Sequence, residues 1–103
     1  MTRSSSPATH AGIFNIPAAH PALPGHFPQA PIVPGVVLLD RVVAAVEAVW
    51  GLRVTGLPQV KFLRPLLPDQ QVELTLIDGG QNMSFRIFHA AATIATGKIE
   101  VLR

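Results

Sequence analysis

The sequence predicts an α+β domain in which one long helix lies against an antiparallel sheet. Two observations predict this class. The run from Gly35 to Trp50 is almost wholly apolar and free of proline, and several short segments of alternating apolar and polar residues follow it. The chain has 103 residues, 49% of them hydrophobic, so it is expected to fold around one core. We divide it into a disordered Ser/Thr/Pro-rich lead, residues 1–10, and a single domain, residues 11–103.

The N-terminal half contains one strand, one proline-rich loop and the helix. Residues 11–16 include β-branched and aromatic residues and stop at Pro17, which predicts a short strand. The next stretch carries four prolines before Pro34, so it forms neither a helix nor a central strand. The helix is expected over 35–50, with Pro34 at its first turn and Gly51 just past its end. Because it is apolar almost all round, we expect it to be wrapped by the sheet.

Extended segments fill the rest of the chain. Residues 52–68 read as extended but broken by Gly56 and Pro58. Residues 71–77 alternate strictly, as a half-solvated antiparallel strand does. A turn is expected at 78–82 and further strands at 83–89 and 93–102.

Composition excludes several classes of function. The chain has no cysteine, so it contains neither disulfides nor thiolate sites. Its eight Lys and Arg residues are scattered with no run of three, too sparse for a nucleic-acid interface. No membrane span or secretory signal is visible, so we expect a soluble, cytoplasmic protein. So small a chain with this much apolar surface is expected to form a dimer.

Three features form a candidate site. His26 lies on the stiff proline-rich loop, which suits either a positioned base or a plain connector. Asp40 shares a helix face with Glu47, which suits an ordinary solvent stripe, but in a sheathed helix it would be a poorly hydrated carboxyl able to donate a proton. Gly35 leaves room at the helix N-terminus, where free backbone N–H groups can polarise a carbonyl, or it merely eases the turn.

The segment GHFPQAPIVPGVVLLD, residues 25–40, resembles the signature of the bacterial (3R)-hydroxyacyl-acyl-carrier-protein dehydratases of the FabA/FabZ type. That signature is His-Phe-Pro, then Pro-x-x-Pro-Gly, then a carboxylate fourteen residues after the histidine. The residues in register are His26, Phe27, Pro28, Pro31, Pro34, Gly35 and Asp40. KFLRPLLPDQ (61–70) and ATGKIEV (95–101) are similar to later strands of the family, so the resemblance covers residues 11–102.

The resemblance implies a hotdog fold, a long helix wrapped by a curved antiparallel sheet, and a dimer with active sites at the subunit interface. It implies that His26 takes the α-proton of a 3-hydroxyacyl thioester and that Asp40 of the other chain protonates the departing hydroxyl. The Gly35 amide would hold the thioester carbonyl. The remaining implied substrate contacts are Phe27, Pro34 and Val36. No cofactor or metal is implied, and the implied partner is an acyl carrier protein.

Two residues depart from the family pattern. Gln29 replaces the usual Gly after His-Phe-Pro, and Ala44 replaces a Gln that hydrogen-bonds the carboxylate. These features and the short chain look closest to the ApeI-like dehydratases of aryl polyene clusters. There the second subunit would be a copy of the chain or another small hotdog protein. A non-catalytic subunit that partners an active dehydratase and an acyl thioesterase stay as alternatives.

The remaining candidates are weaker. A metal site built from His20 and His26 lacks further ligands. His10 lies in the lead and His89 is expected to be solvated. Four cations are candidates for a basic rim that attracts an acidic carrier protein: Arg41, Arg53, Lys61 and Arg64.

Overall fold

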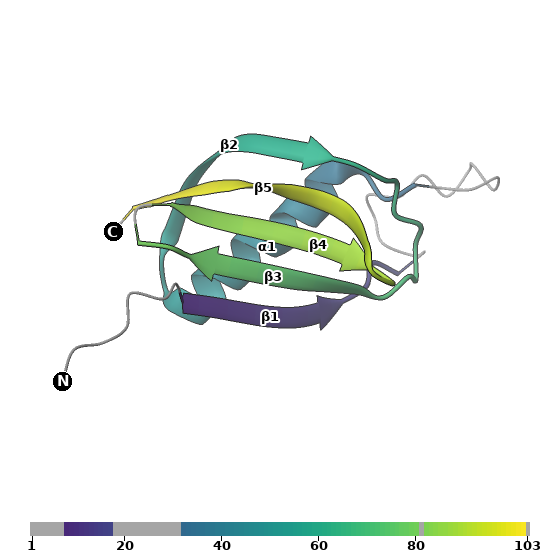
Figure 1. Ribbon diagram of the computed structural model, residues 1–103, viewed down its shortest axis with the longest axis horizontal. Coiled ribbons are helices and arrows are strands. Elements are labelled where there is room, and N and C mark those ends of the chain that lie inside the picture. The colour runs from purple at the N-terminus through teal and green to yellow at the C-terminus, as the bar shows by residue number, and fades with distance from the viewer. Residues whose placement is uncertain (1–7, 18–31, 81, 103) are drawn as a thin grey trace.

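The computed structural model describes residues 8–17, 32–80 and 82–102. Along the described chain the elements are β1 (Ala8–Phe14), α1 (Gly35–Trp50), β2 (Arg53–Phe62), β3 (Val72–Asp78), β4 (Met83–His89) and β5 (Ala92–Leu102). The strands form one sheet in the order β1-β3-β4-β5-β2, and every pair is antiparallel. The helix lies along one face of this sheet (Figure 1). The predicted α+β arrangement is therefore confirmed, with β1 and β2 as the two edges.

The bounds of α1 match the prediction because a proline precedes the helix and a glycine follows it in the sequence. Pro34 precedes the first turn in an extended conformation, with φ −61° and ψ 142°. Gly51 follows the last turn at φ 65°, and its N–H donates to the Glu47 carbonyl at 3.0 Å. This left-handed conformation favours glycine. No side chain caps the N-terminus of α1, and its first turn holds no acidic residue.

One face of α1 packs into the core and another stays open to solvent. The buried residues are Val37, Leu38, Val42 and Val46. The expectation that every apolar side of the helix is covered does not hold in the single chain, since Val36 is 63% exposed and Ala44 and Ala48 are exposed as well. The sheet packs against only one side of α1, so a stripe that includes Asp40 faces away from it.

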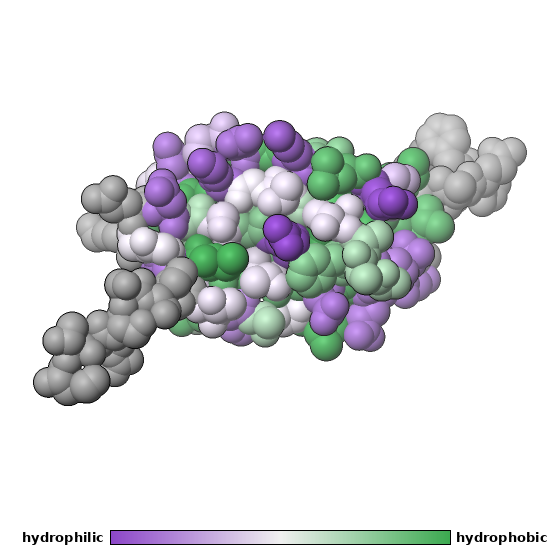
Figure 2. Space-filling model, in the orientation of Figure 1, coloured by the Kyte–Doolittle hydropathy of each residue, from purple (hydrophilic) through white to green (hydrophobic). Residues whose placement is uncertain are grey.

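The core between α1 and the sheet is apolar, and no polar or charged residue of the described chain is buried in it. In β3 the predicted alternation is confirmed: Val72, Leu74 and Leu76 are at most 3% exposed. The opposite face of the sheet is the one seen in Figure 2, where side chains of near-neutral hydropathy cover the middle and hydrophilic ones gather along the β2 edge.

Two strand assignments differ from the prediction. β1 begins at Ala8, and Ala8 to His10 pair with Asp78 to Leu76, so these residues belong to the sheet rather than to the lead. β2 runs unbroken through Gly56 and Pro58, with two register shifts against β5. An edge strand accepts proline because one of its sides needs no amide donors. The β4–β5 turn is made by Ala90 and Ala91, both at positive φ.

Within the described part of the chain, no helix is long and apolar enough to cross a lipid bilayer.

Candidate functional site

A hollow of about 320 Å³ opens beside the first turn of α1. Hydrogen bonds hold its walls together. The Val33 N–H donates to the Leu66 carbonyl at 2.8 Å, and the Leu63 N–H donates to the Ile94 carbonyl at 2.8 Å. Most of the lining is apolar, and it includes Ile32, Leu38 and Phe62. Gly35 also lines the hollow, so the N-terminus of α1 borders an apolar space.

Phe62 covers one side of Gly35. A Cβ atom placed on Gly35 would lie 2.5 Å from Cζ, 2.9 Å from Cε1 and 3.1 Å from Cε2 of the Phe62 ring. Carbon atoms in contact normally lie 3.5–4.0 Å apart, so the ring fills the space of a side chain at this position. The glycine at this position is what lets the ring lie this close to the helix backbone. Sequence reasoning missed Phe62 as a site residue, although it stands in the family-like segment KFLRPLLPDQ.

Asp40 lies on a different face of the same helix. It is exposed and does not line the hollow, so the poorly hydrated surroundings predicted for its carboxyl are absent from the single chain. Five residues separate it from Gly35, which places it about 140° around α1 and about 7.5 Å along the axis. Within one chain, Gly35 and Asp40 therefore face different sides of α1 and cannot both line the same side of one site.

The other predicted contacts are placed only in part. His26 and Phe27 lie outside the described residues, as does Gln29. Pro34 stands half-buried at the entrance to α1, and Val36 is exposed one turn before Asp40. Val36 and Asp40 thus share the solvent-facing stripe, where a second chain can reach both.

Ala44 and Arg41 line a separate groove of about 370 Å³ between α1 and β1. The Arg41 guanidinium lies 4.8 Å from the centre of the Phe14 ring. His10, expected in the lead, belongs to β1 and lines the same groove. The methyl group of Ala44 offers Asp40 no hydrogen bond.

The four candidate cations do not form one rim. Arg41 faces the β1 side of α1, whereas Lys61 and Arg64 lie at the end of β2, at the other edge of the sheet. Arg53 begins β2, about 26 Å from Lys61 along the strand. Of the four, only Arg64 lines the hollow, whereas Lys61 lines a separate groove with Thr96 and Lys98.

Glu47 and His89 have structural partners. The Val54 N–H donates to Oε2 of Glu47 at 3.4 Å, which links the end of α1 to the start of β2. His89 was expected to be solvated, and its side chain is partly exposed. Its ring is half-buried, and Nδ1 lies 2.7 Å from the Gln71 carbonyl, to which it donates. Both side chains therefore tie neighbouring segments together.

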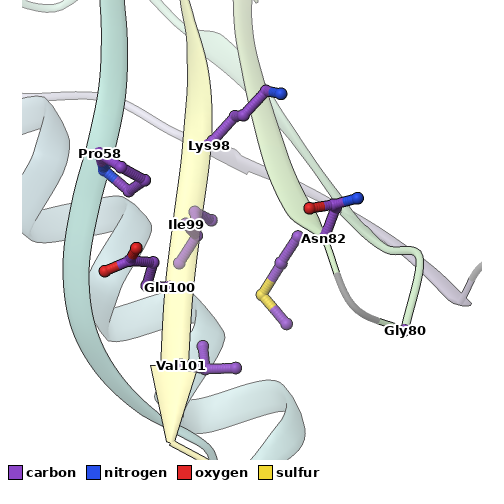
Figure 3. Close-up of a pocket in the computed structure, with 8 residues that line it drawn as sticks. Pro58, Gly80, Asn82, Lys98, Ile99, Glu100 and Val101 are labelled. Atoms are coloured by element: carbon purple, nitrogen blue, oxygen red, sulfur yellow. The ribbon is translucent and has the colours of Figure 1, made fainter.

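A further hollow, of about 460 Å³, lies beside the register shifts of β2 (Figure 3). The Glu100 side chain lies on the β2 side of β5, whereas the Lys98 side chain extends to the other side. The charged groups of this hollow therefore do not converge on one point, and none of the predicted site residues lines it.

The described residues contain no group of three or more His, Asp or Glu side chains able to hold a metal ion. The suggested pair of His20 and His26 falls outside the described residues.

Comparison with known proteins gives the fold and the family. Residues 2–98 match the family described as ApeI-like, ApeI dehydratase. The chain belongs to the ApeI-like dehydratase family. It is similar to the 3-hydroxyacyl-[acyl-carrier-protein] dehydratase FabZ of Rhodopseudomonas palustris strain TIE-1, with 30% identity over 94 residues. The match covers 81% of this chain and 62% of that relative, so the chain spans less than two thirds of the relative's length.

Two solved structures share the fold. One is an uncharacterized protein from Erwinia carotovora, with a TM-score of 0.79, 26% identity, and coverage of 98% of this chain and 88% of that one. The other is a chain of the dehydratase heterocomplex ApeI:P from Xenorhabdus doucetiae, with a TM-score of 0.79, 24% identity, and coverage of 100% and 93%. The predicted hotdog fold is confirmed.

Proposed function

We propose that the chain forms a two-chain enzyme that removes water from (3R)-3-hydroxyacyl thioesters and yields trans-2-enoyl thioesters. The observation that carries this proposal is the placement of Gly35 and Asp40 on different faces of α1. A site that needs both a helix N-terminus and a carboxylate then takes them from two chains. Membership of the ApeI-like dehydratase family supports the reaction type.

Each residue has a defined task in this reaction. His26 of one chain removes a proton from C2 of the substrate, and the electron pair of that C–H bond forms the C2=C3 double bond. The C3–O bond breaks, and Asp40 of the second chain gives its proton to the departing hydroxyl, which leaves as water. The Gly35 N–H donates to the thioester carbonyl oxygen as negative charge develops there.

The surface beside the hollow suits a second chain. Ile32, Val36, Phe62, Leu63 and Leu67 are between 41% and 63% exposed. They lie near the first turn of α1 and the end of β2, whose outer edge has no strand partner among the described residues. A contiguous apolar surface next to an open strand edge is typical of an interaction site. We propose that another copy of the chain, or a second small hotdog subunit, covers it.

Acyl carrier protein or coenzyme A carries the proposed substrate, which places the reaction in fatty acid or polyene biosynthesis in the cytoplasm. The curated relatives support a carrier-protein substrate through their names. Of the four candidate cations, Arg64 is the one best placed to meet an acidic carrier at the hollow.

The test is hydration of crotonyl and longer 2-enoyl thioesters, followed by loss of the enoyl absorbance. His26→Ala and Asp40→Asn should each lower the rate by roughly 10²–10⁴-fold, the usual contribution of a proton-transfer group. Glu47→Gln is the matched control, because it removes a carboxylate from the same side of α1 and should leave the rate within about twofold. Wild-type protein that is folded and dimeric but inactive on all chain lengths would overturn the proposal.

One observation favours a second function, that of a non-catalytic subunit. Ala44 gives Asp40 no amide partner, and one structural relative is a dehydratase heterocomplex. If the chain alone is inactive, this reading requires that addition of an active hotdog dehydratase produce a stable mixed dimer.

A further inference from the structure

The Phe62 ring blocks one approach to the amide that is proposed to hold the substrate carbonyl. Three ring atoms lie within 3.1 Å of the place where a Cβ on Gly35 would be. Figure 1 shows the end of β2, where Phe62 is the last residue, beside the first turn of α1. The ring therefore covers Gly35 on the side where a Cβ would stand, and it is one wall of the hollow that Gly35 borders.

We propose that Phe62 is a specificity-determining residue that admits acyl thioesters unbranched at C2 and rejects those that carry a substituent there. This inference rests on the proposed function, because it assumes that the Gly35 N–H binds the thioester carbonyl. The inference goes beyond the family assignment because it states which substitution at C2 of the substrate the site rejects.

The position of the ring is set by the backbone. Phe62 pairs with Ala95 of β5, and the next residue, Leu63, donates its N–H to the Ile94 carbonyl at 2.8 Å. The side chain itself is 52% exposed, so it forms a wall of the hollow and is not part of the core. Truncation of the ring therefore leaves no cavity in the core of the chain, and the dimeric state of Phe62→Ala is compared with that of the wild type because the second chain is proposed to cover this surface.

The geometry of a thioester explains the discrimination. When the carbonyl oxygen accepts a hydrogen bond from the Gly35 N–H at about 2.9 Å, C2 lies only two bonds from that oxygen. A planar, unbranched acyl group can lie flat against an aromatic face. A methyl group on C2 adds a carbon that must fit beside the same ring, whose Cζ atom would lie 2.5 Å from a Cβ on Gly35. One misplaced methyl or methylene in a pocket typically changes kcat/KM by roughly 10–200-fold.

The experiment compares hydration of crotonyl and 2-methylcrotonyl pantetheine thioesters. The wild type should prefer crotonyl by at least about tenfold in kcat/KM, and Phe62→Ala should reduce that preference by about tenfold through better use of the branched substrate. Ile13→Ala is the control. Ile13 is 64% exposed on the other edge strand, and its truncation should leave the preference unchanged. An unchanged preference in Phe62→Ala, with crotonyl still hydrated, would overturn the inference.

Binding of saturated thioesters separates this inference from the dehydratase reaction. Butyryl and 2-methylpropanoyl pantetheine thioesters carry no double bond to hydrate, so their dissociation constants report only fit. The inference predicts that wild-type protein binds the butyryl compound about tenfold more tightly and that Phe62→Ala binds both alike. Equal binding by the wild type would refute it even if crotonyl is hydrated. Absence of crotonyl hydration with a preserved binding difference would instead contradict the proposed reaction.

Discussion

Replacement of Gly97 by alanine should be among the most destabilising single changes in this protein. Gly97 lies in β5, paired with Val60 of β2 and Phe85 of β4. A Cβ atom there would lie 2.7 Å from Cε2 and 2.9 Å from Cζ of Phe85, and closer still to the Gln59 carbonyl oxygen. The ring would have to move by about 1 Å to restore normal contact, but Phe85 is 1% exposed in a close-packed core.

The loss in free energy of unfolding can be estimated from these two clashes. Overpacking of a core costs about 1–3 kcal/mol. At Gly97 one obstacle is a buried ring and the other is backbone of β2, so we expect the upper end, about 3 kcal/mol. That loss corresponds to a melting temperature lowered by about 12–24 °C for a domain of this size. Urea unfolding, followed by circular dichroism and Trp50 fluorescence at one protein concentration, measures the change.

Gly12→Ala is the matched control for this prediction. Its Cβ would meet only Nε2 of His10 at 3.5 Å, an ordinary contact in the edge strand β1. The same substitution should therefore change the free energy of unfolding by less than about 1 kcal/mol, toward greater stability. If Gly97→Ala is as stable as Gly12→Ala, the packing argument for the centre of the sheet is wrong.

Three further changes test other parts of the fold by the same unfolding measurement. Ala91→Gly should stabilise the protein by about 0.5–1 kcal/mol, because Ala91 has φ 69° in the β4–β5 turn, and a loss of stability would refute this. Leu76→Ala should cost about 2–5 kcal/mol, whereas Ile77→Ala, 37% exposed on the opposite face, should cost less than about 1 kcal/mol. His89→Ala should cost about 1 kcal/mol through loss of its bond to the Gln71 carbonyl, and no change would contradict that contact.

The sequence predicted the secondary-structure elements whose position depends on residues within or next to the element. Pro34 and Gly51 mark the two ends of α1, and strict alternation marks β3, so both were located correctly. The β4–β5 turn was located only as the gap between the predicted strands 83–89 and 93–102, because alanine, the residue at positions 90 and 91, does not normally favour positive φ. The early start of β1 was missed because pairing with β3 orders residues whose own composition is that of a disordered lead.

The sequence predicts which residues form the candidate motif, but it does not predict their surroundings in the folded chain. The family-like spacing of His26, Gly35 and Asp40 can be read along the chain, but the open surroundings of Asp40 depend on how the sheet packs against α1. The contact between Phe62 and Gly35 joins residues that are 27 positions apart, so no local pattern contains it. Such contacts come from tertiary packing.

The central claim is that one active site draws residues from two chains, and subunit complementation tests it most directly. His26→Ala and Asp40→Asn proteins, each inactive alone, are mixed in equal amounts, unfolded, refolded together and assayed for crotonyl thioester hydration. In mixed dimers of a two-fold symmetric enzyme one of the two sites is intact, so about a quarter of the wild-type activity should return. Dimers that form but show no activity above either parent would contradict the claim.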